Sequence, residues 1–173
     1  MTISSASETN HKAQDGERLS PRLLRHPVHL LSLGLGSGLA PVAPGTFGTA
    51  AALPLYLLLR PLDPAAYLAV VAVLFFVGIA LCGHTARALG VHDHPAIVWD
   101  EVVGYLVTMA VAPDGWLWPL IGFALFRLFD IVKPWPVRTA DRHVGGGGGI
   151  MVDDLLAGIY AAVVLQGIAV LAR

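Results

Sequence analysis

Two apolar stretches, residues 65–82 and 155–172, most constrain what this chain can fold into. A helix of about 17 to 25 residues crosses the hydrocarbon core of a bilayer, so both stretches are long enough to do so. Three shorter apolar segments cover residues 47–59, 102–112 and 116–129. Hydrophobic residues make up 55% of the 173 residues, more than a soluble domain of this size usually hides. The sequence therefore predicts an all-α fold, a polytopic membrane helical bundle with about four to five apolar helices.

The rest of the composition bounds the domain count and the partners. Residues 1–20 are polar and lack an apolar core, so we predict a disordered polar tail over residues 1–26 and a single membrane domain over residues 27–173. The net charge of −1 offers no broad basic surface, which argues against a nucleic-acid partner. Cys82 is the single cysteine, which excludes an intrachain disulfide and a cysteine-based zinc cluster.

The basic residues predict which way the chain sits in the membrane. Arg18, Arg22 and Arg25 precede the first apolar stretch, and the positive-inside rule then keeps the N-terminus in the cytoplasm. A secretory signal is the weaker interpretation, because the stretch that follows is short and interrupted by glycine. Five crossings would return residues 83–101 and 130–154 to the cytoplasmic side. Those loops hold Arg87, Lys133, Arg138 and Arg142, whereas the opposite turns hold Arg60, Asp63 and Asp114.

Five carboxylates lie at the ends of the apolar segments, and they are the leading candidates for a functional site. They are Asp100 and Glu101 before residues 102–112, Asp130 at the end of residues 116–129, and Asp153 and Asp154 before residues 155–172. Ionised groups beside apolar helices are costly to desolvate unless they are paired, hydrated or bound to a cation. The helix dipole offers another explanation for acids at a helix start, but negative charge is disfavoured at a C-terminal end, where Asp130 is predicted.

The neighbours of these acids suggest what they bind. Asp100 and Gly104 are one helical turn apart, so the small residue would leave room beside the carboxylate for a metal ion. Arg127 precedes Asp130 by three residues, and Lys133 follows it by three, which also allows a purely structural salt bridge.

Two glycine-rich segments are candidates for phosphate binding. Gly145–Gly149 precede Asp153 and Asp154, and converging backbone N–H groups next to an acid pair suit a phosphate bridged to Mg²⁺. A flexible surface loop followed by an ordinary helix cap is the alternative. In residues 34–49, Ser37 and Thr46 could donate hydrogen bonds to phosphate, although tight helix packing explains that segment equally well.

Four motifs in order are similar to those of the phosphatidylglycerophosphatase A family. They are Gly36–Gly38 followed by Pro44–Thr46, His92–His94 with Ile97–Glu101, Arg127–Asp130 with Lys133–Pro136, and Gly149–Asp154. The resemblance covers approximately residues 28–172. It implies an all-helical, Mg²⁺-dependent lipid phosphatase of the bacterial inner membrane, which converts phosphatidylglycerophosphate to phosphatidylglycerol and phosphate.

With this resemblance, the sequence predicts a complete site facing the cytoplasm. We expect the five carboxylates Asp100, Glu101, Asp130, Asp153 and Asp154 to surround Mg²⁺ and carry catalysis, and Arg127, Lys133, Arg138, Ser37 and Thr46 to bind the phosphate. A covalent aspartyl-phosphate on Asp130 is an alternative route. The predicted partners are a phospholipid substrate and the membrane. Another lipid phosphomonoesterase and a divalent-cation transporter are the competing functions, and the oligomeric state stays open.

Overall fold

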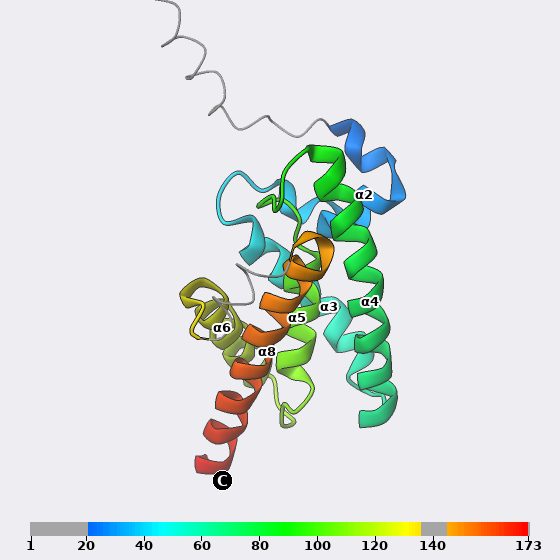
Figure 1. The fold of residues 1–173 in the computed structure, drawn as a ribbon. Helices are drawn as coiled ribbons and strands as arrows, with labels where there is room; N and C mark the ends of the chain where they lie inside the picture. Colours follow the sequence, from blue (N-terminus) through cyan, green and yellow to red (C-terminus); the bar gives the residue numbers. More distant parts are fainter. Residues whose placement is uncertain (1–20, 136–144, 173) are drawn as a thin grey trace, which may run out of the picture.

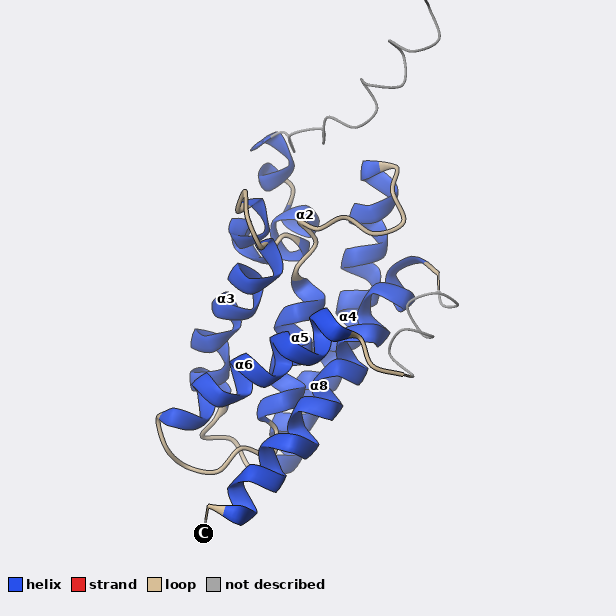
Figure 2. Cartoon of the chain, turned by 90° about the vertical axis from the view of Figure 1, so that its left-hand side faces the viewer, coloured by secondary structure: helices blue, strands red, loops and turns tan. Residues whose placement is uncertain are grey.

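The computed structural model describes residues 21–135 and 145–172, and these residues form helices joined by short turns (Figures 1 and 2). In chain order the elements are η1 (Pro21–Arg25), α2 (Pro27–Ser32), η2 (Gly34–Leu39), α3 (Pro44–Leu59), α4 (Pro64–Leu89), α5 (Trp99–Met109), α6 (Leu117–Val132) and α8 (Gly146–Leu171). No strand occurs in either described range, so the predicted all-α class is confirmed for them. The predicted disordered tail lies mostly outside the described residues, and its last part forms η1.

Helix α5 is the centre of the bundle. It packs against α3, α4, α6 and α8, and Val103, Tyr105 and Leu106 on it are almost fully buried. Two tyrosine hydroxyls join α5 to its neighbours. Tyr105 on α5 donates a hydrogen bond to Pro119 O on α6, and Tyr67 on α4 donates one to Leu106 O on α5. Because α5 is enclosed by other helices, acidic residues in its first turn are buried as well.

Local signals explain where the longest helices begin and end. The Asp63 side chain accepts hydrogen bonds from Ala65 N and Ala66 N, which caps the start of α4. Gly90 adopts a left-handed conformation and ends the same helix. Helix α8 begins at Gly146, well before the apolar stretch at residue 155 from which it was predicted. The predicted loop of glycines is therefore its first turn.

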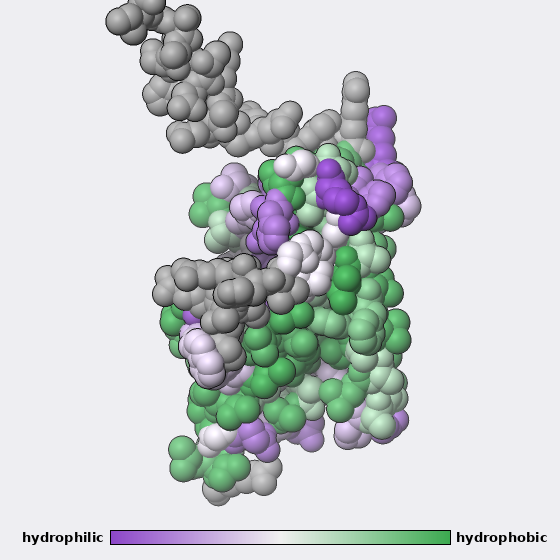
Figure 3. Space-filling model, viewed as in Figure 1, coloured by the Kyte–Doolittle hydropathy of each residue, from purple (hydrophilic) through white to green (hydrophobic). Residues whose placement is uncertain are grey.

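The surface of the bundle suits a membrane. α4 and α8 are long and apolar enough to cross a bilayer, and α3 is a shorter apolar helix. Large apolar side chains such as Leu58, Phe76 and Val163 are exposed. On the face shown in Figure 3, apolar residues cover the middle of the molecule and hydrophilic residues gather toward both ends. Only these two helices of the described residues meet that length and composition, so the predicted bundle of four to five apolar membrane helices is not shown in full.

One ion pair joins two turns at the end of the bundle far from the start of α5. Arg60, after α3, contacts Asp114, before α6, with 2.6 Å between Arg60 Nη2 and Asp114 Oδ1. The two turns therefore lie at the same end of the bundle.

Candidate metal and phosphate site

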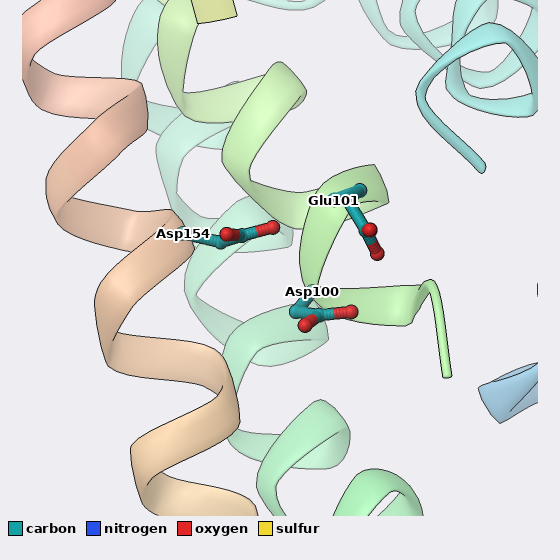
Figure 4. A group of neighbouring side chains, drawn as sticks. All are labelled: Asp100, Glu101 and Asp154. Carbon is teal, nitrogen blue, oxygen red and sulfur yellow. The ribbon is translucent and has the colours of Figure 1, made fainter. Parts of the chain in front are cut away.

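Three of the five carboxylates come together. Asp100 and Glu101 lie in the first turn of α5, and Asp154 reaches toward them from α8 (Figure 4). One carboxylate oxygen from each of the three lies within 4.8 Å of the others. Asp100 and Asp154 are buried, and only 13% of the Glu101 side chain is exposed. Like charges this close and this deeply buried repel one another unless a proton or a cation lies between them.

The unsatisfied oxygens of these residues fit a cation. Asp100 Oδ1, Glu101 Oε2 and Asp154 Oδ2 are buried, and the described residues supply no hydrogen-bond donor to them. Buried polar atoms in folded proteins are almost always satisfied, so each such oxygen requires an explanation. Hard divalent cations such as Mg²⁺ prefer carboxylate oxygens at about 2.0–2.1 Å, and oxygens around one ion are then about 3–4 Å apart.

A close crossing of α5 and α8 sets the distance between Asp100 and Asp154. A methyl group on Gly158 would lie 2.5 Å from Gly104 O, so the two helices approach through these glycines. The hydroxyl of Thr108 lies 3.0 Å from Gly104 O and 3.3 Å from Gly158 O, at the same crossing. Each glycine follows its aspartate by four residues. The crossing therefore lies one turn from both carboxylates and holds them face to face.

This crossing corrects the role predicted for Gly104. The space beside Gly104 is not left for a metal ion, because a methyl group there would lie 2.5 Å from the Phe126 ring and 2.8 Å from Asp154 O. The glycine brings α5, α6 and α8 together. The repeated spacing Asp-x-x-x-Gly in both helices was the sequence signal for this contact, and our sequence analysis missed its second copy.

The glycine run also has a different role from the one predicted. Gly146–Gly149 are helical, and Gly147 is so close to α4 that any side chain would overlap Ile79 O. Gly147 therefore packs α8 against α4, and the run forms the first turn of a helix and not the predicted loop. Because α8 starts at Gly146, Asp153 and Asp154 lie in its third turn, where the dipole of the helix start does not explain them.

Asp130 lies in the last turn of α6, as the sequence predicts, and it is paired. Arg127 Nη1 lies 2.5 Å from Asp130 Oδ2 and 3.8 Å from Glu101 Oε1. The three side chains are largely buried, with 13–15% of each exposed. The guanidinium thus offsets charge on two carboxylates and connects Asp130 to the cluster of Asp100, Glu101 and Asp154.

Lys133 brings in the fifth carboxylate. Lys133 Nζ lies 2.5 Å from Asp153 Oδ2, and the lysine ends α6 in a left-handed conformation with φ 44°. A residue other than glycine adopts this conformation at some energetic expense, which the surrounding contacts must offset. Here the bend at Lys133 turns the chain from α6 toward α8.

The remaining predicted phosphate ligands are less well supported. Ser37 donates its hydroxyl hydrogen to Gly34 O at 2.8 Å, so it stabilises a local turn. Thr46 is half-buried in the first turn of α3, next to Gly45, which contacts the site. Arg138 lies outside the described residues.

Gly45 belongs to the glycine-rich segment 34–49 and to a family motif, but no separate role was predicted for it. It is buried, and a methyl group added to it would overlap Glu101 Oε1 and lie 2.8 Å from Arg127 Nη1. The start of α3 therefore closes one side of the site. No feature of the sequence shows this contact, since it depends on how α3 packs against α5 and α6.

Comparison with known proteins places the chain among the phosphoric monoester hydrolases. The sequence model of phosphatidylglycerophosphatase A matches residues 30–169, and the chain belongs to this family. It is 47% identical to phosphatidylglycerophosphatase A of Escherichia coli over 82% of this chain and 83% of the relative. It is 48% identical to phosphatidylglycerophosphatase A of Haemophilus influenzae over 84% of this chain and 90% of the relative. No solved structure matches the chain.

Proposed function

We propose that this chain removes the phosphate of phosphatidylglycerophosphate with the help of Mg²⁺ at the cluster of Asp100, Glu101 and Asp154. Family membership supports the reaction and the lipid substrate. The single observation that supports the cation is the cluster of Asp100, Glu101 and Asp154, which lies within 4.8 Å through one oxygen of each residue and in which each residue has a buried oxygen without a hydrogen-bond partner among the described residues. When bound, Mg²⁺ would supply positive charge to the phosphate and lower the pKa of a coordinated water.

The five carboxylates then divide into two groups. Asp100, Glu101 and Asp154 would hold the cation, because their oxygens are near one another and lack donors. Asp130 is paired with Arg127, and Asp153 is paired with Lys133, so we propose that these two aspartates orient the basic side chains. This division narrows the sequence prediction, in which all five acids surrounded the metal.

The two basic side chains would bind the phosphate oxygens. Arg127 and Lys133 bring positive charge to the edge of the carboxylate cluster. There they would offset the negative charge on the phosphate oxygens in the transition state. Thr46 and Arg138 remain further candidates for this role. Asp130 is a poor nucleophile here, since its pairing with Arg127 stabilises the carboxylate ground state, so attack by water is favoured over an aspartyl-phosphate.

The site would face the cytoplasm from a multi-pass bundle in the inner membrane. The start of α5, the last turn of α6 and the first turns of α8 contribute the site, and the sequence assigns residues 83–101 and 130–154, which adjoin these helix ends, to the basic side. The Arg60–Asp114 pair would then lie on the periplasmic side. Labelling a cysteine introduced at Asp114 from outside intact cells would test this orientation.

Phosphate release from purified full-length chain in detergent tests the proposed function. We expect release from phosphatidylglycerophosphate that requires added Mg²⁺, stops with EDTA and is slower with phosphatidate or undecaprenyl diphosphate. Asp100→Asn should abolish release, while Asp114→Asn, at the other end of the bundle, should not affect it. Full activity of the Asp100→Asn variant, or activity unchanged by EDTA, would contradict the proposal.

A further inference from the structure

A side chain on Gly45, at the start of α3, would meet the tips of two site residues, because its three nearest atoms belong to the side chains of Glu101 and Arg127. A methyl group on Gly45 would overlap Glu101 Oε1 and lie 2.8 Å and 3.1 Å from Arg127 Nη1 and Nη2. These atoms are the ends of flexible side chains, which move easily. By contrast, a methyl group on Gly158 meets the Gly104 carbonyl, which moves only if whole helices shift. An alanine at position 45 would therefore displace the carboxylate and leave the backbone in place.

We propose that Gly45 is a positioning residue that fixes the carboxylate of Glu101 for cation binding. This inference rests on the proposed function, in which Glu101 is a ligand. Arg127 holds one side of Glu101 from α6, at 3.8 Å from Oε1, and Gly45 bounds the same oxygen from α3. The other oxygen, Oε2, is buried and accepts no hydrogen bond from the described residues, as expected for an atom that binds a metal ion.

The geometry explains why a glycine is needed at this position. Displacement of Oε1 by a methyl group would move the Glu101 carboxylate relative to Asp100 and Asp154, each of which has an oxygen within 4.8 Å of a Glu101 oxygen. Removing a side chain atom from Glu101 would restore the room. Glu101→Asp shortens that side chain by one methylene and draws the carboxylate back from α3, so an alanine at position 45 should then be tolerated.

Binding of Mn²⁺, used as a substitute for Mg²⁺, measures this effect without relying on activity. We would titrate the full chain in detergent micelles by electron paramagnetic resonance, for wild type, Gly45→Ala, Glu101→Asp and the double variant. Gly45→Ala should weaken Mn²⁺ binding by about tenfold or more, the usual effect of disturbing residues that orient metal ligands. In the Glu101→Asp background, the same substitution should have little further effect. Gly167→Ala is the matched control, because a methyl group there meets nothing within 4 Å.

Several outcomes would overturn the inference. Unchanged Mn²⁺ binding in Gly45→Ala, or an equal loss in both backgrounds, would show that Gly45 does not act through Glu101. Failure of Gly45→Ala to fold, seen in thermal unfolding, would show a structural role instead. If the wild type itself bound no Mn²⁺, the proposed cation site would fail, and this inference with it. If the wild type and Gly45→Ala bound Mn²⁺ equally well, the proposed role of Gly45 would be wrong, but the proposed cation site would stand.

Discussion

Two clusters of titratable side chains in the described part of the chain have their polar atoms satisfied in different ways. Asp100, Glu101 and Asp154 meet at α5 and α8, and each keeps a buried oxygen that no described residue satisfies. His26, His29 and His84 meet where α2 packs on α4, with ring centroids 5.0–6.0 Å apart. A histidine ring can be neutral near pH 7, whereas a carboxylate is ordinarily ionised there.

The histidine cluster therefore needs no bound ligand. His26 and His84 are exposed, and His29 Nδ1 lies 2.9 Å from the Thr85 hydroxyl, so the buried ring has a hydrogen-bond partner. The buried carboxylates of Asp100, Glu101 and Asp154 avoid mutual repulsion only with a proton or a cation between them. Similar crowding is thus explained by ordinary packing in the histidine cluster, whereas in the carboxylate cluster it is the basis for the cation site proposed above. Four predictions test this difference.

The largest effect is expected from removing one carboxylate of the cluster. Asp154→Asn should lower phosphate release by at least about 10³-fold and abolish Mn²⁺ binding, since it removes a cation ligand, and loss of a single transition-state hydrogen-bond donor is already worth about 10²–10³-fold. Asp130→Asn should also lower phosphate release but should retain Mn²⁺ binding, because Asp130 is paired with Arg127. Equal loss of Mn²⁺ binding in both variants would contradict the division of the five acids into two groups.

The next effect concerns the positive charge beside the cluster. Arg127→Met should lower the free energy of unfolding by about 3 kcal/mol, because it leaves Glu101 and Asp130 buried without their countercharge. Arg60→Met removes an ion pair whose partner Asp114 is exposed, and it should change stability by less than about 1 kcal/mol. Unfolding of both variants in detergent, at the same pH and salt, measures the difference. Similar stabilities would show that Arg127 is not needed to balance the cluster.

The sequence offered the Arg127–Asp130 pair as an alternative to metal and phosphate binding, but it did not predict the packing around the pair. Arg127 and Asp130 are three residues apart on one helix, so their contact follows from local geometry. The partners of Glu101 and Asp154 come from other helices, and their distances depend on where those helices cross. Gly104 was predicted to leave room for a metal ion, and the run that contains Gly147 was predicted to bind phosphate through its backbone, but neighbouring helices fill the space beside both glycines. Glycine has low helix propensity, so the run before Asp153 was predicted as a loop, and packing against α4 overrode that preference.

A smaller effect is expected at the helix crossing. Gly158→Ala should destabilise the chain by about 1 to 3 kcal/mol and weaken Mn²⁺ binding, because the added methyl group pushes α8 away from the Gly104 carbonyl. Gly167→Ala, on the same helix, meets nothing within 4 Å and should be neutral or slightly stabilising. Thermal unfolding and Mn²⁺ titration of both variants compare them directly. A harmless Gly158→Ala would mean that the crossing does not fix the distance between Asp100 and Asp154.

The smallest effect is expected in the histidine cluster, and it depends on pH. Burial, with nearby His26 and His84, lowers the pKa of His29 below its ordinary value of 6.5. The unfolded chain therefore binds a proton near pH 6.5 that the folded chain still excludes, so His29 contributes less stability as the pH falls below that value. His29→Asn should flatten this part of the pH dependence of the unfolding temperature between pH 7.5 and 5.5, and it should leave Mn²⁺ binding at pH 7.5 unchanged. A variant that lost Mn²⁺ binding would show that the two clusters are coupled, contrary to their separate placement on α2–α4 and α5–α8.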